Sequence, residues 1–410
     1  MKILQVNKFH YPRGGADRYY LDLSESLSKA GHELAFFAMH HPKNLKTKWS
    51  KYFVSRVSFN EDIWKYAWKI PGRLLYSLEA KRKFSALLKD FQPDVIHCHN
   101  IYHQLSPSIL HAAKKAKIPV IMHLHDYSLV CPNHSLFTHG EVCQQCQPGK
   151  YWPCVKRKCV KNSRTASFLA ATELYLHQKL LNIYQKNIEL FISPSEFLKK
   201  TLISNKWPEN KVRVISNPFR CNLRAVEVTE MKKYFLYFGR LSQEKGIDLA
   251  IKALKLNSEL TLKIVGQGPE KASLQLLADN LKVSERIEFI DWQEGNELSR
   301  LIIQAQAVLI PSRWLENFPL NALESLSLGT PIIAANIGGL PEIVNNKNGL
   351  LIQPEDSQAL AEAMDTVNNG KISWNKEEIK ISAEAFSPDK NLQDVLTVYQ
   401  EVIEKQLHRA

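Results

Sequence analysis

The chain has 410 residues, of which 44% are hydrophobic and 23% are charged. This length suits two domains of ordinary size, and the composition is that of a chain with a buried core, which excludes wholesale disorder. No apolar run reaches the roughly 18 residues that span a bilayer, and the first residues are expected to form a strand and not a signal peptide. Seven cysteines, an odd number, disfavour a disulfide framework, so a cytoplasmic protein is expected.

The positive charge is concentrated in one half of the chain. Residues 1–220 carry 34 basic and 15 acidic side chains, whereas residues 221–410 carry 20 basic and 26 acidic ones. The formal net charge of +13 therefore comes from the first half. A cationic half favours an anionic partner, such as a phospholipid surface, a nucleic acid or an acidic substrate.

In chain order, the first half alternates short apolar strands with helical segments. A strand at 2–7 is followed by a Gly-Gly loop and by a helix over 19–30 with leucines along one side. Short apolar strands separated by helices are typical of a buried parallel sheet. Further strands are expected at 34–39, 94–97, 119–123 and 190–193.

The second half repeats this alternation after a non-periodic stretch at 218–232. A helix is expected over 246–256 and a long terminal helix over 391–408. The whole pattern predicts an α/β fold with two Rossmann-like domains that face each other across a cleft. The expected strands lie at 234–238, 261–265, 287–290, 307–310 and 331–334.

The most informative segment follows the expected strand 307–310. It reads PSRWLENFPLNALE over residues 311–324, with Glu316 in a loop and Glu324 in the first two turns of a helix that begins near Pro319. Free backbone N–H groups at the start of a helix form an anion site. Two carboxylates that flank such a site suit a sugar nucleotide, which has hydroxyls at both ends and a diphosphate between them.

The spacing of Glu316 and Glu324 resembles the E-x7-E pattern of retaining glycosyltransferases of the GT-B fold, family GT4, also called glycosyl transferases group 1. Other motifs stand in the order in which that family has them, so the resemblance covers nearly the whole chain. These motifs are Gly14-Gly15, His125-Asp126, Ser193-Pro194-Ser195, Gly239-Arg240, Lys245-Gly246, Gly266-Gln267-Gly268-Pro269 and Gly329-Thr330-Pro331.

The resemblance implies an acceptor-binding domain over 1–217, with a Cys-rich insert at about 131–162, and a nucleotide-sugar-binding domain over 218–390. The terminal helix, within 391–410, would cross back to the first domain. The expected reaction moves a sugar from a nucleotide sugar to a glycan or a lipid-linked acceptor with retention of configuration.

The resemblance also implies roles for individual residues. Glu316 would hold hydroxyls of the transferred sugar, His125 would orient the sugar or the acceptor, and Arg240 and Lys245 would neutralise the diphosphate. Glu324 would accept hydrogen bonds from the ribose. The donor-binding residues implied are Glu324, Arg240, Lys245, Gly15, Gly268, Asn317, Phe318, Pro319 and Leu320.

Each of these residues also has an ordinary structural interpretation. The two glutamates could be a helix-capping acid and an exposed helix acid, the two cations a solvated pair, and His125 the partner of a nearby carbonyl. Gly266 and Gly268 could form a plain strand-to-helix turn. Two rival functions stay open, namely a GT-B enzyme of another class (phosphorylase, sugar-nucleotide hydrolase or epimerase) and a zinc-stapled basic binding module on a degenerate scaffold.

The sequence contains no Asp-x-Asp, the usual pair of ligands for a divalent ion that holds a nucleotide diphosphate. Arg240, Lys245 and a helix end are expected to replace that ion. A retaining enzyme without a nucleophile can use front-face substitution, in which the departing phosphate oxygen takes the proton of the acceptor. We therefore expect catalysis without a metal cofactor.

Five of the seven cysteines lie between residues 131 and 159. Cys143-x-x-Cys146 has the spacing of a metal clip, and two more cysteines follow in an insert with few apolar residues. We predict a structural zinc, because a metal would stabilise such an insert; reduced thiols in a loose loop are the alternative. The predicted ligands are Cys143, Cys146, Cys154 and Cys159, with Cys131 as a substitute.

Three histidines, His97, His99 and His103, follow the strand at 94–97. They could line the acceptor side of the cleft or bind a metal, but partly buried histidines with ordinary hydrogen bonds are the simpler interpretation.

Between Lys43 and Lys89 there are twelve basic and three acidic residues, and Lys150–Arg164 adds more basic ones. Basic residues mixed with aromatic ones favour peripheral docking on an anionic membrane leaflet, although a solvated basic face over core aromatics has the same composition. No nucleic-acid-binding motif is present, so a nucleic acid is not an expected partner. The aromatic residues are Trp49, Tyr52, Phe53, Trp64, Tyr66, Trp68 and Tyr76.

Overall fold

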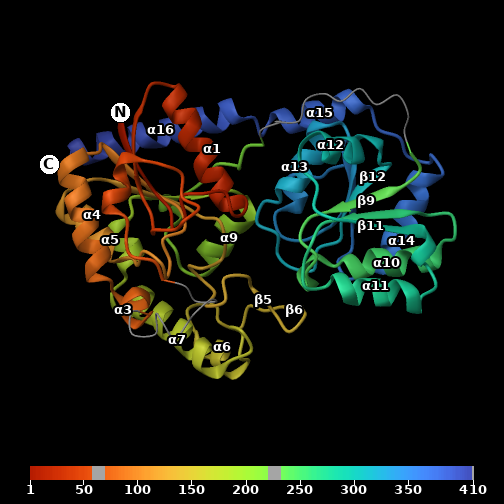
Figure 1. Cartoon of the computed structure of the whole chain (residues 1–410), viewed down its shortest axis with the longest axis horizontal. Coiled ribbons are helices and arrows are strands. Elements are labelled where there is room, and N and C mark those ends of the chain that lie inside the picture. The colour runs from red at the N-terminus through yellow and green to blue at the C-terminus, as the bar shows by residue number, and fades with distance from the viewer. Residues whose placement is uncertain (58–69, 220–231, 409–410) are drawn as a thin grey trace. The chain divides into compact units, whose positions relative to one another are not determined.

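A computed structural model describes residues 1–57, 70–219 and 232–408 of the chain (Figure 1). Contacts within the chain divide it into two compact units, each built on a six-stranded sheet with helices around it. The first unit comprises Met1–His134, Gln144–Ser216 and Pro388–Ala410. The second unit comprises Ser135–Cys143 and Asn217–Ser387.

The sheet of the first unit has the strand order β2-β1-β3-β4-β7-β8, and all neighbouring strands are parallel. Every residue of β3, β4 and β7 is buried, as expected for strands covered on both faces. The strands are β1 (Lys2–Val6), β2 (Glu33–Phe37), β3 (Val95–Cys98), β4 (Val120–His123), β7 (Leu190–Ser193) and β8 (Val212–Val214). The helices are α1 (Gly15–Lys29), η1 (Lys48–Tyr52), α3 (Ile70–Leu75), α4 (Leu78–Phe91), α5 (Ser108–Lys115), α6 (Trp152–Lys156), α7 (Arg164–Tyr175), the π-helical turn η2 (Leu176–Leu180), α8 (Ile183–Asn187), α9 (Glu196–Ser204), η3 (Glu209–Lys211) and α16 (Pro388–Leu407).

The sheet of the second unit has the order β11-β10-β9-β12-β13-β14, again with parallel neighbours. A short hairpin, β5 (Phe137–Thr138) with β6 (Glu141–Val142), also belongs to this unit. The strands are β9 (Phe235–Phe238), β10 (Leu262–Val265), β11 (Ile287–Ile290), β12 (Ala307–Ile310), β13 (Ile332–Ala335) and β14 (Gly349–Ile352). The helices are η4 (Gln243–Lys245), α10 (Ile247–Leu256), α11 (Lys271–Asn280), η5 (Ser284–Arg286), α12 (Gly295–Gln304), α13 (Leu320–Ser327), η6 (Leu340–Glu342), α14 (Ser357–Asn368) and α15 (Lys376–Glu384).

The last helix, α16, packs into the first unit, as the sequence led us to expect. Its residues Val395, Val398, Tyr399 and Val402 are buried in one apolar cluster with Ile3 of β1. Asn391 anchors the start of the helix by donating a hydrogen bond of 2.9 Å to the carbonyl of Ser216. None of the helices in the described ranges combines the length and the apolar character needed to cross a membrane.

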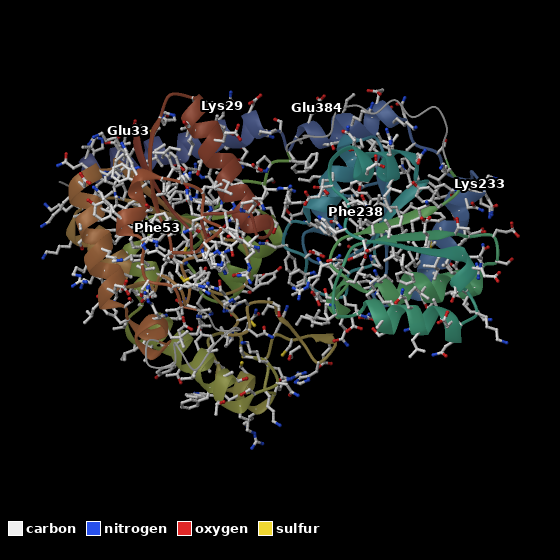
Figure 2. All side chains as sticks on the ribbon, viewed as in Figure 1. Lys29, Glu33, Phe53, Lys233, Phe238 and Glu384 are labelled. Atoms are coloured by element: carbon white, nitrogen blue, oxygen red, sulfur yellow. The ribbon has the colours of Figure 1, made fainter. Side chains whose placement is uncertain are left out.

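Figure 2 contrasts interior and surface side chains within each unit. Phe53 is fully buried in the first unit and Phe238 is buried in the second, whereas Lys29 and Lys233 are exposed. Trp49 is also buried, so these two aromatics of the basic stretch between Lys43 and Lys89 are core residues and are not exposed for membrane contact. The aromatics at positions 64, 66 and 68 lie outside the described residues.

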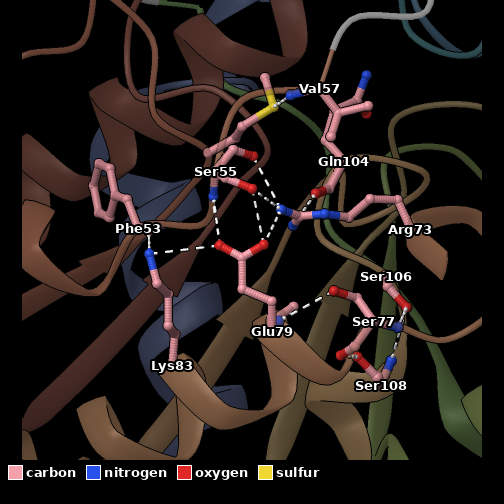
Figure 3. Close-up of polar contacts among 12 residues, drawn as sticks. Phe53, Ser55, Val57, Arg73, Ser77, Glu79, Lys83, Gln104, Ser106 and Ser108 are labelled. Carbon is pink, nitrogen blue, oxygen red and sulfur yellow. Dashed lines mark hydrogen bonds and ion pairs between the residues drawn. The ribbon is translucent and has the colours of Figure 1, made fainter. Parts of the chain in front are cut away.

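A buried guanidinium ties this stretch to the rest of the first unit (Figure 3). Arg73, 3% exposed, donates to the carbonyl of Gln104 at 3.0 Å and to the Ser55 hydroxyl at 2.8 Å. Its ion pair with Glu79 on α4 has an N···O distance of 2.6 Å. Glu79 in turn accepts from the backbone and hydroxyl of Ser55, so one network fixes three segments of the chain.

Candidate active site

In an open parallel sheet, ligands bind beyond the carboxyl ends of the strands, where successive connections leave in opposite directions. In the second unit this switch point lies between β9 and β12, because β10 and β11 extend the sheet on one side of β9 and β12 to β14 extend it on the other. The segment after β9 carries Gly239, Arg240 and Lys245, and the segment after β12 carries Ser312 and Glu316. The predicted catalytic residues of this unit therefore meet at its switch point.

Lys245 and Glu316 form a close ion pair there. The Lys245 Nζ lies 2.7 Å from Glu316 Oε1, and the Ser312 hydroxyl donates to the same oxygen, also at 2.7 Å. The Glu316 side chain is 5% exposed and that of Lys245 is 22% exposed. Lys245 Nζ also lies over the Trp314 ring, 5.0 Å from its centroid. A carboxylate held this way is oriented before any ligand binds.

Arg240 differs from Lys245 because it is exposed, and no acidic group in the described ranges forms an ion pair with it. Its backbone is fixed, since the Tyr237 hydroxyl donates to the Arg240 carbonyl at 2.8 Å. The arrangement leaves a guanidinium available to an anion.

Glycines let the loops at this switch point approach each other closely. A Cβ on Gly268 would lie 2.1 Å from the carbonyl oxygen of Leu241, and a Cβ on Gly266 would lie 1.9 Å from that of Gly239. A Cβ on Gly246 would lie 2.0 Å from the carbonyl oxygen of Pro311. These glycines thus bring the loops after β9, β10 and β12 into backbone contact.

The other predicted donor-binding residues of this unit differ in burial and in the element that carries them. Asn317 is buried, and the Phe318 ring packs in the core 5.4 Å from the ring of Phe386. Pro319 caps α13, which begins at Leu320, and Glu324 lies half-buried on that helix. Phe318 is therefore a core residue whose side chain supports the loop.

In the first unit the switch point lies between β1 and β3. Gly15 begins α1 and is exposed, and His125 follows β4. His125 Nε2 lies 3.1 Å from His99 Nδ1, and His99 Nε2 lies 3.0 Å from Gln5 Oε1. His97 Nδ1 lies 2.7 Å from the Tyr399 hydroxyl of α16. His97 and His99 are thus fully buried, not partly buried as in the simpler interpretation of the sequence; both form hydrogen bonds, although His97 Nε2 has no partner among the described residues.

Two histidines near this switch point, His99 and His125, are kept neutral by their surroundings. Burial lowers the pKa of His125 and of His99 well below the ordinary value, and the neighbouring imidazoles lower both further. The pKa of Lys8, just after β1, is also lowered by burial, although Asp126 and Asp17 oppose this. His125 is therefore suited to hydrogen bonding and not to carrying charge.

The Cys-rich insert forms a small apolar cluster and is not a loose loop. Cys146 and Cys154 are buried with Tyr151, and Cys159 packs against them. The pKa of the Cys154 thiol is raised, chiefly by its hydrogen bond with the Cys159 thiol and also by burial. Cys143 lies in the second unit. No group of three or more His, Cys, Asp or Glu side chains in the described ranges is arranged to hold a metal ion, so the zinc ligand set stays a prediction.

Comparison with known proteins identifies the family. The model of "Glycosyltransferase Family 4" matches residues 13–222, just over half of the chain, and that of "Glycosyl transferases group 1" matches residues 220–378. The chain belongs to glycosyltransferase family 4. It is therefore an enzyme that transfers sugars.

Relatives match most of this glycosyltransferase at low identity. It is 24% identical to the glycogen synthase of Mycobacterium tuberculosis over 390 residues, which cover 90% of this chain and 86% of that protein. It is 23% identical over 361 residues to an uncharacterized 42.6 kDa protein in the cps region of Klebsiella pneumoniae, covering 84% of this chain and 87% of the relative.

Solved structures show the fold of the glycosyltransferase. HepE of Anabaena in complex with UDP superposes with a TM-score of 0.70 at 19% identity, covering 98% of this chain and 100% of that chain. The lipopolysaccharide outer core galactosyltransferase WaaB gives a TM-score of 0.68 at 18% identity, covering 99% and 100%. The chain therefore has the GT-B fold of two Rossmann-like domains.

Two residues that support the site, Ser312 and Gln5, were not predicted from the sequence. Ser312, 1% exposed, holds Glu316 by a hydrogen bond, but a single serine in a loop carries no recognisable pattern. The link from Gln5 to His99 joins β1 to the residue after β3. Only the parallel pairing of those strands could have indicated it.

Proposed function

We propose that this glycosyltransferase moves a sugar from a nucleotide sugar to a glycan or lipid-linked acceptor with retention of configuration and without a catalytic metal. The observation that carries the proposal is the oriented Lys245–Glu316 pair at the switch point of the second unit, together with the exposed Arg240 in the same segment after β9. Structures of HepE with UDP and with UDP-glucose support a nucleotide-sugar donor.

In the proposed complex the donor spans the loops after β9 and β12. Glu324 accepts from the ribose hydroxyls, and Arg240 and Lys245 neutralise the diphosphate. Glu316 accepts from hydroxyls of the sugar, because its charge and its low exposure make it a strong acceptor in a site with little water. The backbone at Gly268, and at Asn317 to Leu320, lines the donor.

The proposed chemistry is front-face substitution. The bond between the anomeric carbon and the phosphate oxygen breaks, and the acceptor oxygen forms its bond on the same face of the sugar. The departing phosphate oxygen takes the acceptor proton. The cations stabilise the charge that grows on the diphosphate, which is usually the largest contribution to such a rate. Gly15 and the neutral His125 of the first unit are proposed to position the sugar and the acceptor.

A chelator and the configuration of the product test this chemistry together. We expect turnover to persist in excess EDTA, because fixed cations replace the divalent ion, and we expect an α-linked donor to give an α-linked product. The measurement is product formation with and without EDTA, followed by NMR of the anomeric proton. Loss of turnover with EDTA that added magnesium restores, or an inverted product, would contradict the proposal.

Donor identity is accessible through thermal shift. UDP-, GDP- and ADP-sugars are compared on the wild-type chain and on Glu324→Ala. The true donor should raise the melting temperature of the wild type and raise that of the variant much less, because the ribose loses its acceptor. An equal shift in both proteins would remove Glu324 from the donor site.

A structural zinc in the insert remains a separate proposal, since the Cys143-x-x-Cys146 spacing with two further cysteines after it suits a tetrahedral metal that supplies folding energy. Freshly purified, reduced protein should contain about one zinc per chain by elemental analysis. A metal-free protein of unchanged stability would show that the apolar cluster of the insert suffices by itself.

A further inference from the structure

Four of the seven exposed residues of α7 and η2 are aromatic or aliphatic, and the other three are Arg164, Thr165 and Lys179. The side chains of Phe168, Leu169, Tyr175 and Leu180 are 49%, 45%, 48% and 68% exposed. The opposite side of the same helix faces the core and carries Ser167, Ala171, Leu174 and His177, all buried. A surface helix normally presents polar residues to solvent, so packing within the described residues does not explain these four exposed apolar side chains.

A neighbouring helix extends this apolar surface. Trp152 of α6 is 49% exposed, and its ring centroid lies 5.9 Å from that of Phe168. The two helices pack together in the first unit and are marked in Figure 1. Scattered exposed apolar residues are normal, but a contiguous group marks an interaction site. We call this group the α6–α7 patch; it comprises Trp152, Phe168, Leu169, Tyr175 and Leu180.

The charge around the α6–α7 patch is of one sign. Residues 146–186 contain eight lysines and arginines and a single acid, Glu173. Glu173 is buried, with its carboxylate 3.0 Å from His103 Nδ1, and so contributes no negative charge at the surface. The exposed cations of α6, of the following loop and of the start of α7 are Lys156, Lys158, Lys161 and Arg164.

This combination favours one partner. Exposed aromatic and leucine side chains insert at the level of lipid headgroups, and each nearby lysine or arginine contributes about 1 kcal/mol of attraction to an anionic leaflet. A second copy of the chain would place two cationic patches against each other, which costs free energy. The cations alone would also suit a nucleic acid, but they would not require exposed tryptophan, phenylalanine and leucine.

We propose that the α6–α7 patch docks this enzyme on a bilayer of anionic phospholipids. The apolar side chains enter the interface and the surrounding cations hold the headgroups. Docking does not depend on the identity of the donor or the acceptor, so it can succeed or fail independently of the proposed reaction.

Vesicle flotation of the full chain tests the proposal. The wild type should float with vesicles that contain about one third phosphatidylglycerol and should stay unbound with pure phosphatidylcholine. The variant Phe168→Gln/Tyr175→Gln/Leu180→Gln should lose binding while its melting temperature stays unchanged, because these side chains face solvent. Replacing Lys156, Lys158, Lys161 and Arg164 by glutamine should weaken binding at least about tenfold, since several contributions of about 1 kcal/mol are lost.

A matched control removes exposed apolar side chains elsewhere. Leu276 and Trp292 of the second unit are 61% and 54% exposed, and Leu276→Gln/Trp292→Gln should float like the wild type. Equal binding to neutral and anionic vesicles, no binding by the wild type, or full binding by the patch variant would each overturn the proposal. So would a wild-type dimer in sedimentation that the patch variant lacks, because that result would assign the surface to a second copy.

Discussion

Two arginines near the switch point of the second unit are held in different ways. Arg313 forms ion pairs with Asp248 and with Glu355, the latter at 2.7 Å, and the Asp248 carboxylate raises its pKa. Arg240 is exposed and has no such pair in the described ranges. The difference separates a cation that stabilises the fold from one that is available to a ligand.

We predict opposite phenotypes for the two arginines. Arg240→Met should lower kcat by about 10²–10³ with an unchanged melting temperature, because it removes stabilisation of the leaving group. Arg313→Met should lower the free energy of unfolding by about 1–3 kcal/mol, because it leaves the half-buried Asp248 with Lys252 as its remaining ion-pair partner. Steady-state kinetics and urea unfolding of both variants provide the check. A destabilised Arg240→Met with normal kcat would contradict the assignment.

The sequence motifs contain the charged residues of the candidate site but not the side chains that hold them in place. Glu316 and Lys245 stand in recognisable motifs, and the structure brings them to 2.7 Å of each other. Phe318, expected to contact the donor, instead packs in the core. A loop motif gives the order of residues but not which side chains turn inward, because that depends on the space left by distant elements such as Phe386.

At the scale of elements, the backbone contacts at these glycines hold the loops after β9, β10 and β12 together. A change at one loop therefore has to displace the others, including the loop that carries Arg240. This close approach needs residues without a Cβ at 246, 266 and 268, and the positive φ angles of Gly246 and Gly266 favour glycine as well.

Gly268→Ala should therefore affect both stability and donor binding. The new Cβ would meet the Leu241 carbonyl oxygen at 2.1 Å, and we expect a loss of about 1–3 kcal/mol together with a smaller thermal shift by the donor. Gly72→Ala on α3 is the control, because its Cβ would have no neighbour within 4 Å and stability should change by at most about 1 kcal/mol. If the donor raised the melting temperature of Gly268→Ala as much as that of the wild type, this turn would not contribute to donor binding.

Most strands of both sheets were predictable because they are short and rich in apolar residues. The strands at 190–193, 287–290 and 307–310 have the expected bounds. Two edge strands, β8 and β14, were missed. Arg213 interrupts the apolar pattern of β8, which has only three residues, and β14 is short and begins with Gly349, a residue that weakens a strand pattern.

Across the whole molecule, ionisable histidines are almost confined to one unit. Of the 14 histidines, only His139 falls in the ranges of the second unit. Burial lowers the pKa of His10 to about 4, and burial likewise lowers that of His134 to about 4 and that of His97 well below its ordinary value. Each of these groups resists protonation in the folded state.

The first unit should therefore unfold before the second in mild acid. Below a pH of about 6.5 these histidines bind protons in the unfolded chain but stay neutral in the folded unit. The free energy of unfolding is therefore highest above that pH and falls by up to about 1.4 kcal/mol per pH unit for each such histidine. Hydrogen exchange at about pH 5 should show lost protection within 1–134 and 144–216 and retained protection within 232–387. Simultaneous loss in both units would contradict this prediction.

Because α16 belongs to the first unit, the order of synthesis determines when that unit can fold. The core around Ile3 needs Val395, Val398, Tyr399 and Val402, which follow the whole second unit in the sequence and are therefore synthesised after it. The second unit, complete by Ser387, can fold while synthesis continues. The first unit can complete its core only after the second unit has been synthesised. A nascent chain truncated before residue 388 should therefore expose that unfinished core to chaperones.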